Sequence, residues 1–174
     1  MNARREAVAA WVIVDLGDDL VWLPTLARWH YDQWGPLTGA SSCEDYAGRL
    51  TEAAASRAVP SVLVAVSRGA LLGSVSLLAS DLPARPQLTP WLAQLFVEPT
   101  HRSAGLGAAL VRAALERAGC CGYPRVYLYT SGTLPDYTGG WAGEWWSGWT
   151  ISSVREPSWP TICDRRHRHA EVRR

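Results

Sequence analysis

The residues best suited to chemistry lie in a glycine-rich turn at residues 102–107. The turn follows the apolar run Trp91–Val97 and opens a helical pattern. Backbone N–H groups in such a turn point outward, and the N-terminus of the following helix adds a partial positive charge, so the segment can hold an anion. Gly105 and Gly107 let a phosphate approach the backbone, and Arg102 adds a charged donor. The segment therefore predicts a phosphate-binding turn.

Two other phosphate-binding motifs do not fit this turn. A P-loop would end in Gly-Lys-Ser/Thr, which residues 102–107 lack. A dinucleotide-binding turn would have a third glycine and a downstream acidic residue that binds ribose, and the sequence shows neither. Two interpretations remain. The turn has a structural role only, or it binds the pyrophosphate of another cofactor.

Apolar periodicity predicts the elements that must position the turn. Strands are expected over residues 10–16, 61–66, 71–78, 91–97 and 125–129. Helices are expected over residues 20–34, from Ser41 or Ser42 to about residue 57, and over residues 105–118, with Gly35-Pro36 ending the first. The order β-α-α-β-β-β-α-β predicts an α/β fold with a mixed central sheet and a parallel strand pair around the glycine-rich helix.

This pattern resembles the GNAT N-acetyltransferase family. Arg102-x-x-Gly105-x-Gly107 is similar to the family's Gln/Arg-x-x-Gly-x-Gly/Ala signature and lies, as there, between the fourth strand and the third helix. The resemblance covers roughly residues 10 to 137. It implies a GNAT-like fold with a core domain at residues 8–137, and direct transfer of an acetyl group from acetyl-CoA to a primary amine of a small molecule or a protein.

The resemblance also assigns the residues that hold acetyl-CoA. The splayed fourth strand offers backbone groups to the pantetheine arm, at Leu95, Phe96 and Val97. The pyrophosphate lies against Arg102 and the backbone N–H groups that follow it, at Ser103, Ala104, Gly105, Leu106 and Gly107. These roles are what the family implies for this sequence.

The resemblance identifies fewer catalytic residues than cofactor-binding residues. In this family a base, often acting through water, takes the amine proton, and a Tyr often protonates the leaving thiolate. Tyr137 fits that acid by its position just beyond the strand at 125–129. The family often has a Glu on its fourth strand, but this sequence has Gln94, which cannot accept a proton. Glu98 and Asp81 are therefore candidate bases.

The first helical region is expected to shape the acceptor site. In this family the stretch that contains His30, Tyr31 and Trp34 lines the acceptor pocket, and His30 is a third candidate for the base. An acidic or aromatic acceptor site is the hypothesis that these residues support. They do not identify the acceptor amine.

Residues 138–174 depart from the family pattern. Where the family has a Tyr-bearing helix, a Leu-Gly-Phe/Trp turn and two further strands, this sequence is rich in Gly and Trp, and we expect an atypical, poorly ordered tail. One hypothesis is a frameshift close to residue 137, because reading from the third base of each codon allows, with permissible codons, a Leu-Gly-Trp turn and an alternating strand, in which the Gly is forced by the single Trp codon. The C-terminal strands are then lost or non-native, and the strand at 125–129 has an exposed edge.

Composition limits the other classes of function. The chain has 174 residues, of which 48% are hydrophobic and 19% charged, which is typical of one globular domain. A net charge of +1, and apolar runs well short of the roughly 20 residues of a membrane span, argue against nucleic-acid partners and membranes. The cysteines lack metal-ligand spacing, so we expect no metal site and a cytoplasmic protein with free thiols. A homodimer is left open.

Two functions outside catalysis also remain. Gln94 and the altered tail favour a non-catalytic acyl-CoA-binding or regulatory module, which would bind acetyl-CoA without turnover. The same phosphate turn could serve a nucleotide-binding module, which would prefer ATP to coenzyme A.

Overall fold

A mixed sheet runs through the described part of the protein. The structure is a computed structural model that describes residues 11–130, 144–146 and 149–155. The spatial order of the strands is β1-β2-β3-β4-β5-β7-β6, and neighbours are antiparallel except for β4 and β5. The strands are β1 (Val12–Asp15), β2 (Ser61–Ser67), β3 (Ala70–Leu78), β4 (Trp91–Val97), β5 (Arg125–Thr130), β6 (Glu144–Trp146) and β7 (Trp149–Arg155).

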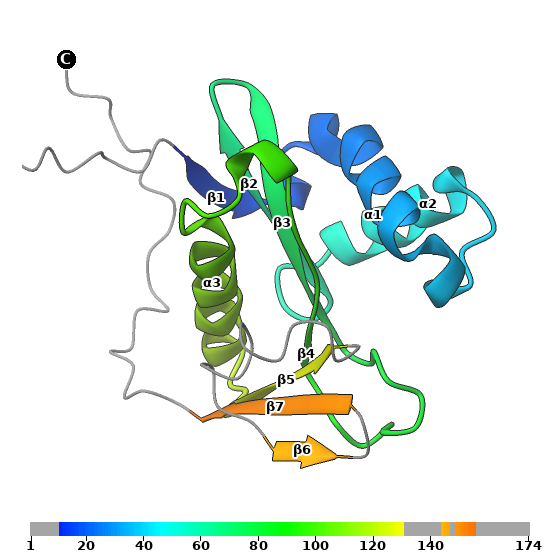
Figure 1. The fold of residues 1–174 in the computed structure, drawn as a ribbon, viewed down its shortest axis with the longest axis vertical. Helices are drawn as coiled ribbons and strands as arrows, with labels where there is room; N and C mark the ends of the chain where they lie inside the picture. Colours follow the sequence, from blue (N-terminus) through cyan, green and yellow to red (C-terminus); the bar gives the residue numbers. More distant parts are fainter. Residues whose placement is uncertain (1–10, 131–143, 147–148, 156–174) are drawn as a thin grey trace, which may run out of the picture.

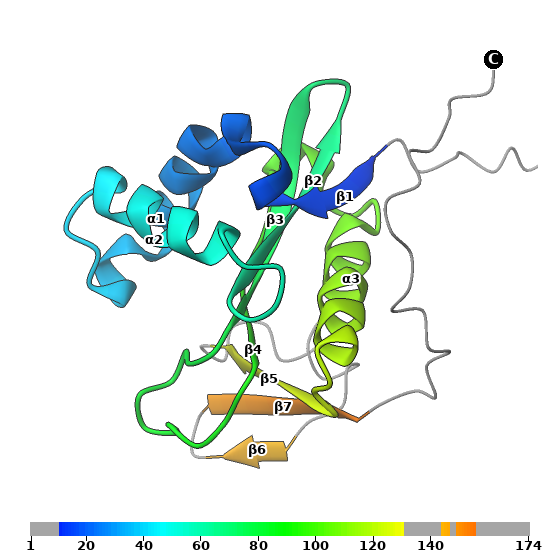
Figure 2. The ribbon, with the colours of Figure 1, turned by 180° about the vertical axis from the view of Figure 1, so that it is seen from behind.

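Helices cover both faces of this sheet. The α-helices of the described residues are α1 (Leu23–Thr38), α2 (Cys43–Ala54) and α3 (Leu106–Cys120). Short 3-10 helices are η1 (Leu16–Asp18), η2 (Leu20–Trp22) and η3 (Pro99–His101). α1 and α2 lie on one face and α3 on the other (Figures 1 and 2). The mixed α/β architecture and the predicted element order are therefore confirmed.

Alternation along β2 divides the apolar interior into two layers. Leu63 and Ala65 belong to the layer of α3, in which Leu110 is fully buried. Val62 and Val64 belong to the layer of α1 and α2. Successive side chains of a strand point to opposite faces, so one continuous apolar strand serves both layers.

α1 is longer than the sequence predicts. Gly35-Pro36 predicts an end at residue 34, but the helix continues to Thr38. It ends at Gly39, which takes a φ of +67° and whose N–H donates to the Gly35 carbonyl. A Cβ at Gly35 would lie 2.6 Å from the ring of Tyr31, so glycine here permits side-chain packing within the helix. The prediction was wrong because a proline in the last turn removes one hydrogen bond without preventing that turn from forming.

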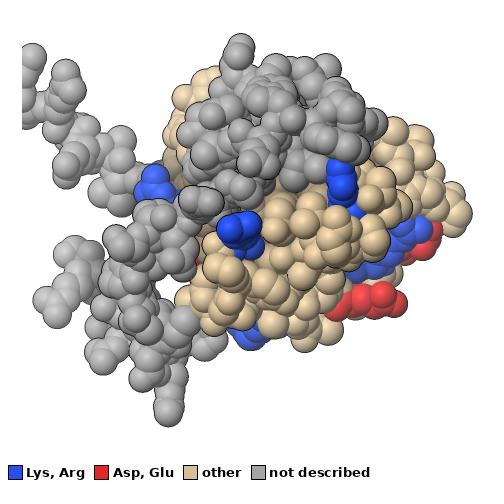
Figure 3. Space-filling model, turned by 90° about the horizontal axis from the view of Figure 1, so that it is seen from below, with Lys and Arg blue, Asp and Glu red and all other residues tan. Residues whose placement is uncertain are grey.

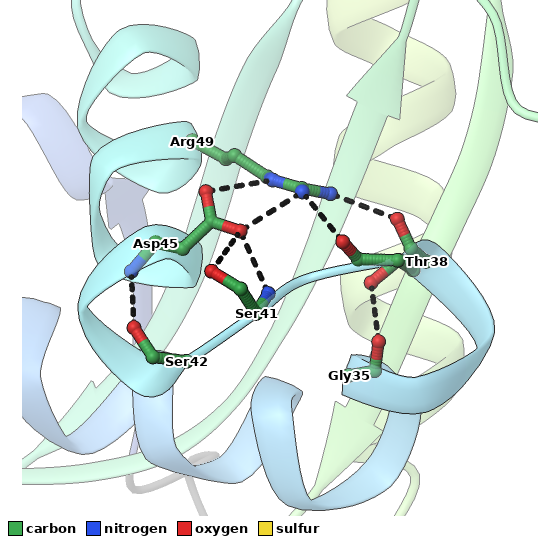
Figure 4. A network of polar contacts seen from close by, with 7 residues as sticks. Gly35, Thr38, Ser41, Ser42, Asp45 and Arg49 are labelled. Atoms are coloured by element: carbon green, nitrogen blue, oxygen red, sulfur yellow. Dashed lines mark hydrogen bonds and ion pairs between the residues drawn. The ribbon is translucent and has the colours of Figure 1, made fainter.

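Arg49 stabilises the turn between α1 and α2 through hydrogen bonds to both (Figure 4). Its guanidinium donates to the carbonyl oxygens of Thr38, at 2.9 Å, and Gly39, at 3.3 Å, which satisfies acceptors at the end of α1. It also pairs with Asp45 on α2 at 3.0 Å. The hydrogen bond from the Ser41 N–H lowers the pKa of Asp45 most, and the hydrogen bond from Arg49 lowers it further. These contacts therefore join α1 to α2.

The two C-terminal strands correct one expectation. β7 pairs antiparallel with β5, from Arg125 opposite Arg155 to Thr130 opposite Thr150, and β6 pairs with β7. The edge of β5 is covered, so the expected exposed edge is wrong, while the expectation that these strands are non-native stays a prediction. A strand ladder uses backbone groups, and Thr150 and Ile151 are β-branched residues that favour extended chain.

The frameshift hypothesis stays a prediction about the gene. Sequencing codons 130 to 150 tests it, because a base gained or lost there would restore the family pattern. Residues 131–143, 147–148 and 156–174 lie outside the described residues. The domain division after residue 137 and the poor order of the tail therefore also stay predictions.

Charges are scattered over one face of the described protein (Figure 3). On the face shown in Figure 3, basic and acidic side chains lie at several separate places among uncharged residues. Within the described ranges, no helix is long and apolar enough to cross a membrane. The same residues contain no group of His, Cys, Asp and Glu side chains that could hold a metal ion.

Candidate active site

β4 and β5 separate after a short parallel contact. Only Trp91 and Leu92 of β4 pair with described residues of β5. β4 continues to Val97, so residues 93–97 have one backbone edge without a described strand partner. Trp91 is fully buried, whereas residues 94–97 are half-buried. This edge offers N–H and C=O groups to an extended ligand.

A bulge lies where β4 leaves β5. Ser76 pairs with Ala93 and Ser74 with Phe96, so β4 has one residue more than β3 between these pairs. Gln94 lies in this extra stretch with a φ of +52°, a left-handed conformation that residues other than glycine rarely adopt. Because a bulge bends its strand and increases the local twist, it accounts for the separation of the two strands.

The glycine-rich turn has the backbone of an anion site. Ser103 and Gly105 take φ values of +63° and +83°, and α3 begins directly afterwards at Leu106. A Cβ at Gly105 would meet no atom within 4 Å, so the space beside the backbone is open. The N–H groups of the first helical turn have no partner within the helix, and the helix dipole favours an anion there. The turn therefore fits a diphosphate.

Arg102 is anchored beside this turn. Its Nε donates to the carbonyl oxygen of Val97, the last residue of β4, at 2.9 Å. The side chain is exposed, and this bond uses Nε alone. Nη1 and Nη2 therefore remain suited to a phosphate.

Glu98 acts as a cap for η3. Its carboxylate accepts hydrogen bonds from the Thr100 N–H at 2.9 Å, from the Thr100 hydroxyl, and from Nδ1 of His101 at 2.8 Å. The Thr100 and His101 side chains lower the pKa of Glu98. A lower pKa makes a weaker base, so the geometry favours another residue for proton abstraction.

α1 places an aromatic wall against the second half of β4. Trp29 packs on Phe96 with ring centroids 5.0 Å apart, and Trp34 meets Phe96 edge-on at 6.3 Å. His30 lies edge-on to Trp34 at 5.1 Å. The structure therefore brings both predicted acceptor residues, His30 and Trp34, to the side of β4 that faces α1. A ligand at this wall would meet aromatic rings.

His30 is a buried, neutral imidazole. Its side chain is 0% exposed, and Nε2 lies 2.8 Å from Oγ of Ser74. Among the described residues Nδ1 has no hydrogen-bond partner. Burial lowers the pKa of His30 to about 3. Such a group is a weak base without access to a substrate, so His30 supports the aromatic wall.

The buried His30 predicts a pH dependence of stability. Its pKa is lower in the folded chain than in the unfolded chain, so the unfolded chain binds the proton first and stability falls as the pH drops below about 6.5. The free energy of unfolding should fall by about 2 kcal/mol between pH 7 and pH 5. In urea titrations, His30→Gln should lack this loss, and the exposed control His101→Gln should keep it. An unchanged pH dependence in His30→Gln would contradict the neutral, buried state.

Asp81 and Tyr46 are titratable groups that are partly and fully buried, respectively. Burial raises the pKa of Asp81, and it raises the pKa of Tyr46 to about 12. The charge of Asp81 makes a smaller contribution to the raised pKa of Tyr46 than burial does. The Tyr46 hydroxyl accepts a hydrogen bond from Nε2 of Gln94, which lies in the bulge of β4, at 2.6 Å. Asp81 is half-buried and hence accessible.

Sequence reasoning missed part of this arrangement. The helical spacing of Tyr46 indicates a core position, which gives no signal for the partner of its hydroxyl. The residues predicted to hold the cofactor lie at the C-terminal end of β4 and in the turn that leads into the N-terminus of α3. Tyr137 lies outside the described residues, so its role as the acid stays a prediction.

Comparison with known proteins gives the class. The model described as "Acetyltransferase (GNAT) family" matches residues 23–135, which is more than half of the chain. The protein therefore belongs to the acetyltransferase (GNAT) family, as the glycine-rich turn predicted. No functionally curated protein matched the sequence.

Solved structures share the fold. An acetyltransferase of Streptococcus agalactiae is 14% identical with a TM-score of 0.62, over 85% of this chain and 99% of that one. The protein yncA of Salmonella typhimurium, whose structure contains its cofactor acetyl-CoA, is 16% identical with a TM-score of 0.64, over 88% and 99%. An aminoglycoside 6'-acetyltransferase type Ii is 17% identical with a TM-score of 0.60, over 82% and 94%. At these identities the likeness establishes the fold.

Proposed function

We propose that the protein is an acetyl-CoA-dependent N-acetyltransferase that acts on a primary amine of a small molecule or a protein. The junction of β4 and α3 carries this proposal, because the unpaired edge of residues 93–97 leads into the turn at 102–107. An extended pantetheine arm needs the first feature and a pyrophosphate needs the second. The similar yncA structure, which contains acetyl-CoA, supports this co-substrate. Titration calorimetry should show that the protein binds acetyl-CoA with much higher affinity than ATP.

The reaction requires one proton to leave the amine and one to reach the thiolate. The amine nitrogen forms a bond to the thioester carbonyl carbon, the carbon–sulfur bond breaks, and the sulfur leaves with its electron pair. Asp81 is our proposed base, directly or through a water, because it is half-buried, its pKa is raised, and its charge acts on Tyr46, the partner of Gln94. Tyr137 remains the proposed acid by its sequence position.

Removing the carboxylate of Asp81 should slow catalysis. We expect Asp81→Asn to lower kcat by about 100-fold, since a general base contributes about 10²–10⁴. Only the ionised carboxylate accepts a proton, so the parent rate should fall as the pH drops through the raised pKa of Asp81, and the variant should lose that limb. Initial rates of coenzyme A release against pH measure both effects.

Glu98→Gln is the matched control for this experiment. Its carboxylate is held by Thr100 and His101, so its loss should change kcat by less than about threefold. A parent-like rate in Asp81→Asn, or a large loss in Glu98→Gln, would contradict the choice of base. Acetyl-CoA affinity should stay unchanged in both variants.

A non-catalytic acyl-CoA-binding module is the second candidate. The observation that favours it is Gln94, an amide on the strand where the family often has a carboxylate. Such a module would bind acetyl-CoA with the same backbone groups and release no coenzyme A in the presence of amines. Binding and turnover measured on the same sample separate the two functions.

A further inference from the structure

The side chain of Gln94 is bound at both ends. Its Oε1 accepts the hydroxyl of Ser76 on β3 at 2.7 Å, and its Nε2 donates to the hydroxyl of Tyr46 on α2 at 2.6 Å. Ser76 is 0% exposed and Tyr46 1% exposed, so both partners are fixed within the core. An amide suits this position because it offers an acceptor and a donor at once. The bulge is therefore tied to two different elements.

These bonds explain a backbone conformation that glutamine would otherwise avoid. A left-handed residue at a bulge is commonly glycine, which has no Cβ and pays no steric cost. A residue other than glycine keeps such a conformation only where its surroundings hold it. For Gln94 the described surroundings are the Ser76 and Tyr46 hydroxyl groups. Glycine at this position would relieve the strain and lose both anchors.

We infer that Gln94 is a positioning residue for acetyl-CoA, which holds the bulge through Ser76 and Tyr46 and thereby sets the direction of the unpaired edge at residues 95–97. The inference rests on the proposed function. The bulge lies between the last pair with β5 and the edge that leads to the glycine-rich turn. A change in the bulge therefore redirects the edge that would receive the pantetheine arm, while the turn itself, at the start of α3, keeps its own geometry.

Two variants test the anchors separately. Tyr46→Phe removes one hydroxyl and keeps the buried ring, and Gln94→Gly removes the amide while tolerating the positive φ. We expect each to weaken acetyl-CoA binding by about tenfold. Adenosine 3′,5′-bisphosphate, which lacks the pantetheine arm, should bind within about twofold of the parent in both. Calorimetry with each ligand measures these values, and Tyr123→Phe, which removes a hydroxyl beyond the far end of α3, is the matched control.

The two ligands distinguish positioning from a general loss of structure. A folding defect would weaken both ligands together, whereas a displaced edge weakens only acetyl-CoA. The double variant should lose no more than about the larger single effect, because the two groups share one hydrogen bond. Unchanged acetyl-CoA affinity in both single variants, or equal losses for both ligands, would overturn the inference. A parent protein that binds no acetyl-CoA would overturn the proposed function and this inference with it.

Discussion

Gly105→Val is expected to weaken acetyl-CoA binding by at least about a hundredfold. Gly105 takes a φ of +83° directly before α3, a conformation that a β-branched residue avoids. The new side chain would also occupy the open space beside the turn, where no atom lies within 4 Å of a Cβ. Losing two charge-assisted hydrogen bonds, at about 1.5–3 kcal/mol each, gives this magnitude. Isothermal titration calorimetry measures the change.

Gly122→Val is the matched control for this prediction. Gly122 also has a φ of +83° with no atom within 4 Å of a Cβ, but it lies beyond the opposite end of α3. Both variants should lose stability by about 1–3 kcal/mol from the strained backbone. Only Gly105→Val should lose affinity. Equal losses of affinity, or none in Gly105→Val, would show that the turn does not hold the pyrophosphate.

Arg117→Ala is expected to lower the free energy of unfolding by about 3 kcal/mol. Nη1 and Nη2 of Arg117 donate to the two carboxylate oxygens of Asp15 at 3.0 and 2.6 Å, with side chains 22% and 8% exposed. After the truncation the buried Asp15 carboxylate keeps its ion pair with Arg57, whose side chain is 56% exposed and whose Nη1 lies 3.5 Å from Oδ2 of Asp15. Denaturant titration measures the loss. The pair joins the end of β1 to the far end of α3, so acetyl-CoA affinity should not change.

Two further variants identify the cause of that loss. Arg112→Ala removes an exposed arginine from the same helix and should change stability by less than about 0.5 kcal/mol. Asp15→Asn in the Arg117→Ala background should regain part of the loss, because the uncompensated charge is gone. A loss in Arg117→Ala no larger than that in Arg112→Ala would mean that the pair contributes little to stability.

The cofactor-binding part of the site could be predicted because it is formed by residues that are close together in the sequence. A strand, a turn with Gly105 and Gly107, and a helix are consecutive in the sequence, and each has its own pattern of apolar residues and glycines. The range 91–97 predicted for β4 is the one observed. The end of α1 was less predictable, because tertiary packing decides whether a helix continues past Gly35-Pro36.

The part of the candidate site formed by α1, α2 and the bulge of β4 depends on contacts between residues that are distant in the sequence. Nothing local indicates that Gln94 bonds to Tyr46, which is 48 positions away, or that His30 lies against Ser74 at a separation of 44. The positive φ of Gln94 could not be inferred either, since glycine is the residue expected in that conformation. The pairing of β7 with β5 could not be predicted, because the Gly- and Trp-rich sequence before β7 has no strand period and the ladder depends on a partner strand elsewhere in the sequence.

Amine-dependent acetyl transfer tests the central claim most directly. The protein would be incubated with acetyl-CoA and a panel of primary amines, including aminoglycosides, polyamines and lysine-containing peptides, and products would be identified by mass spectrometry. The chain contains no Lys, so any acetyl-lysine must come from an acceptor. We predict an acetylated product from at least one amine, and much less of it with Gly105→Val at an acetyl-CoA concentration near the parent's Kd. Acetyl-CoA binding without an acetylated product from any amine would contradict the account and favour an acyl-CoA-binding module.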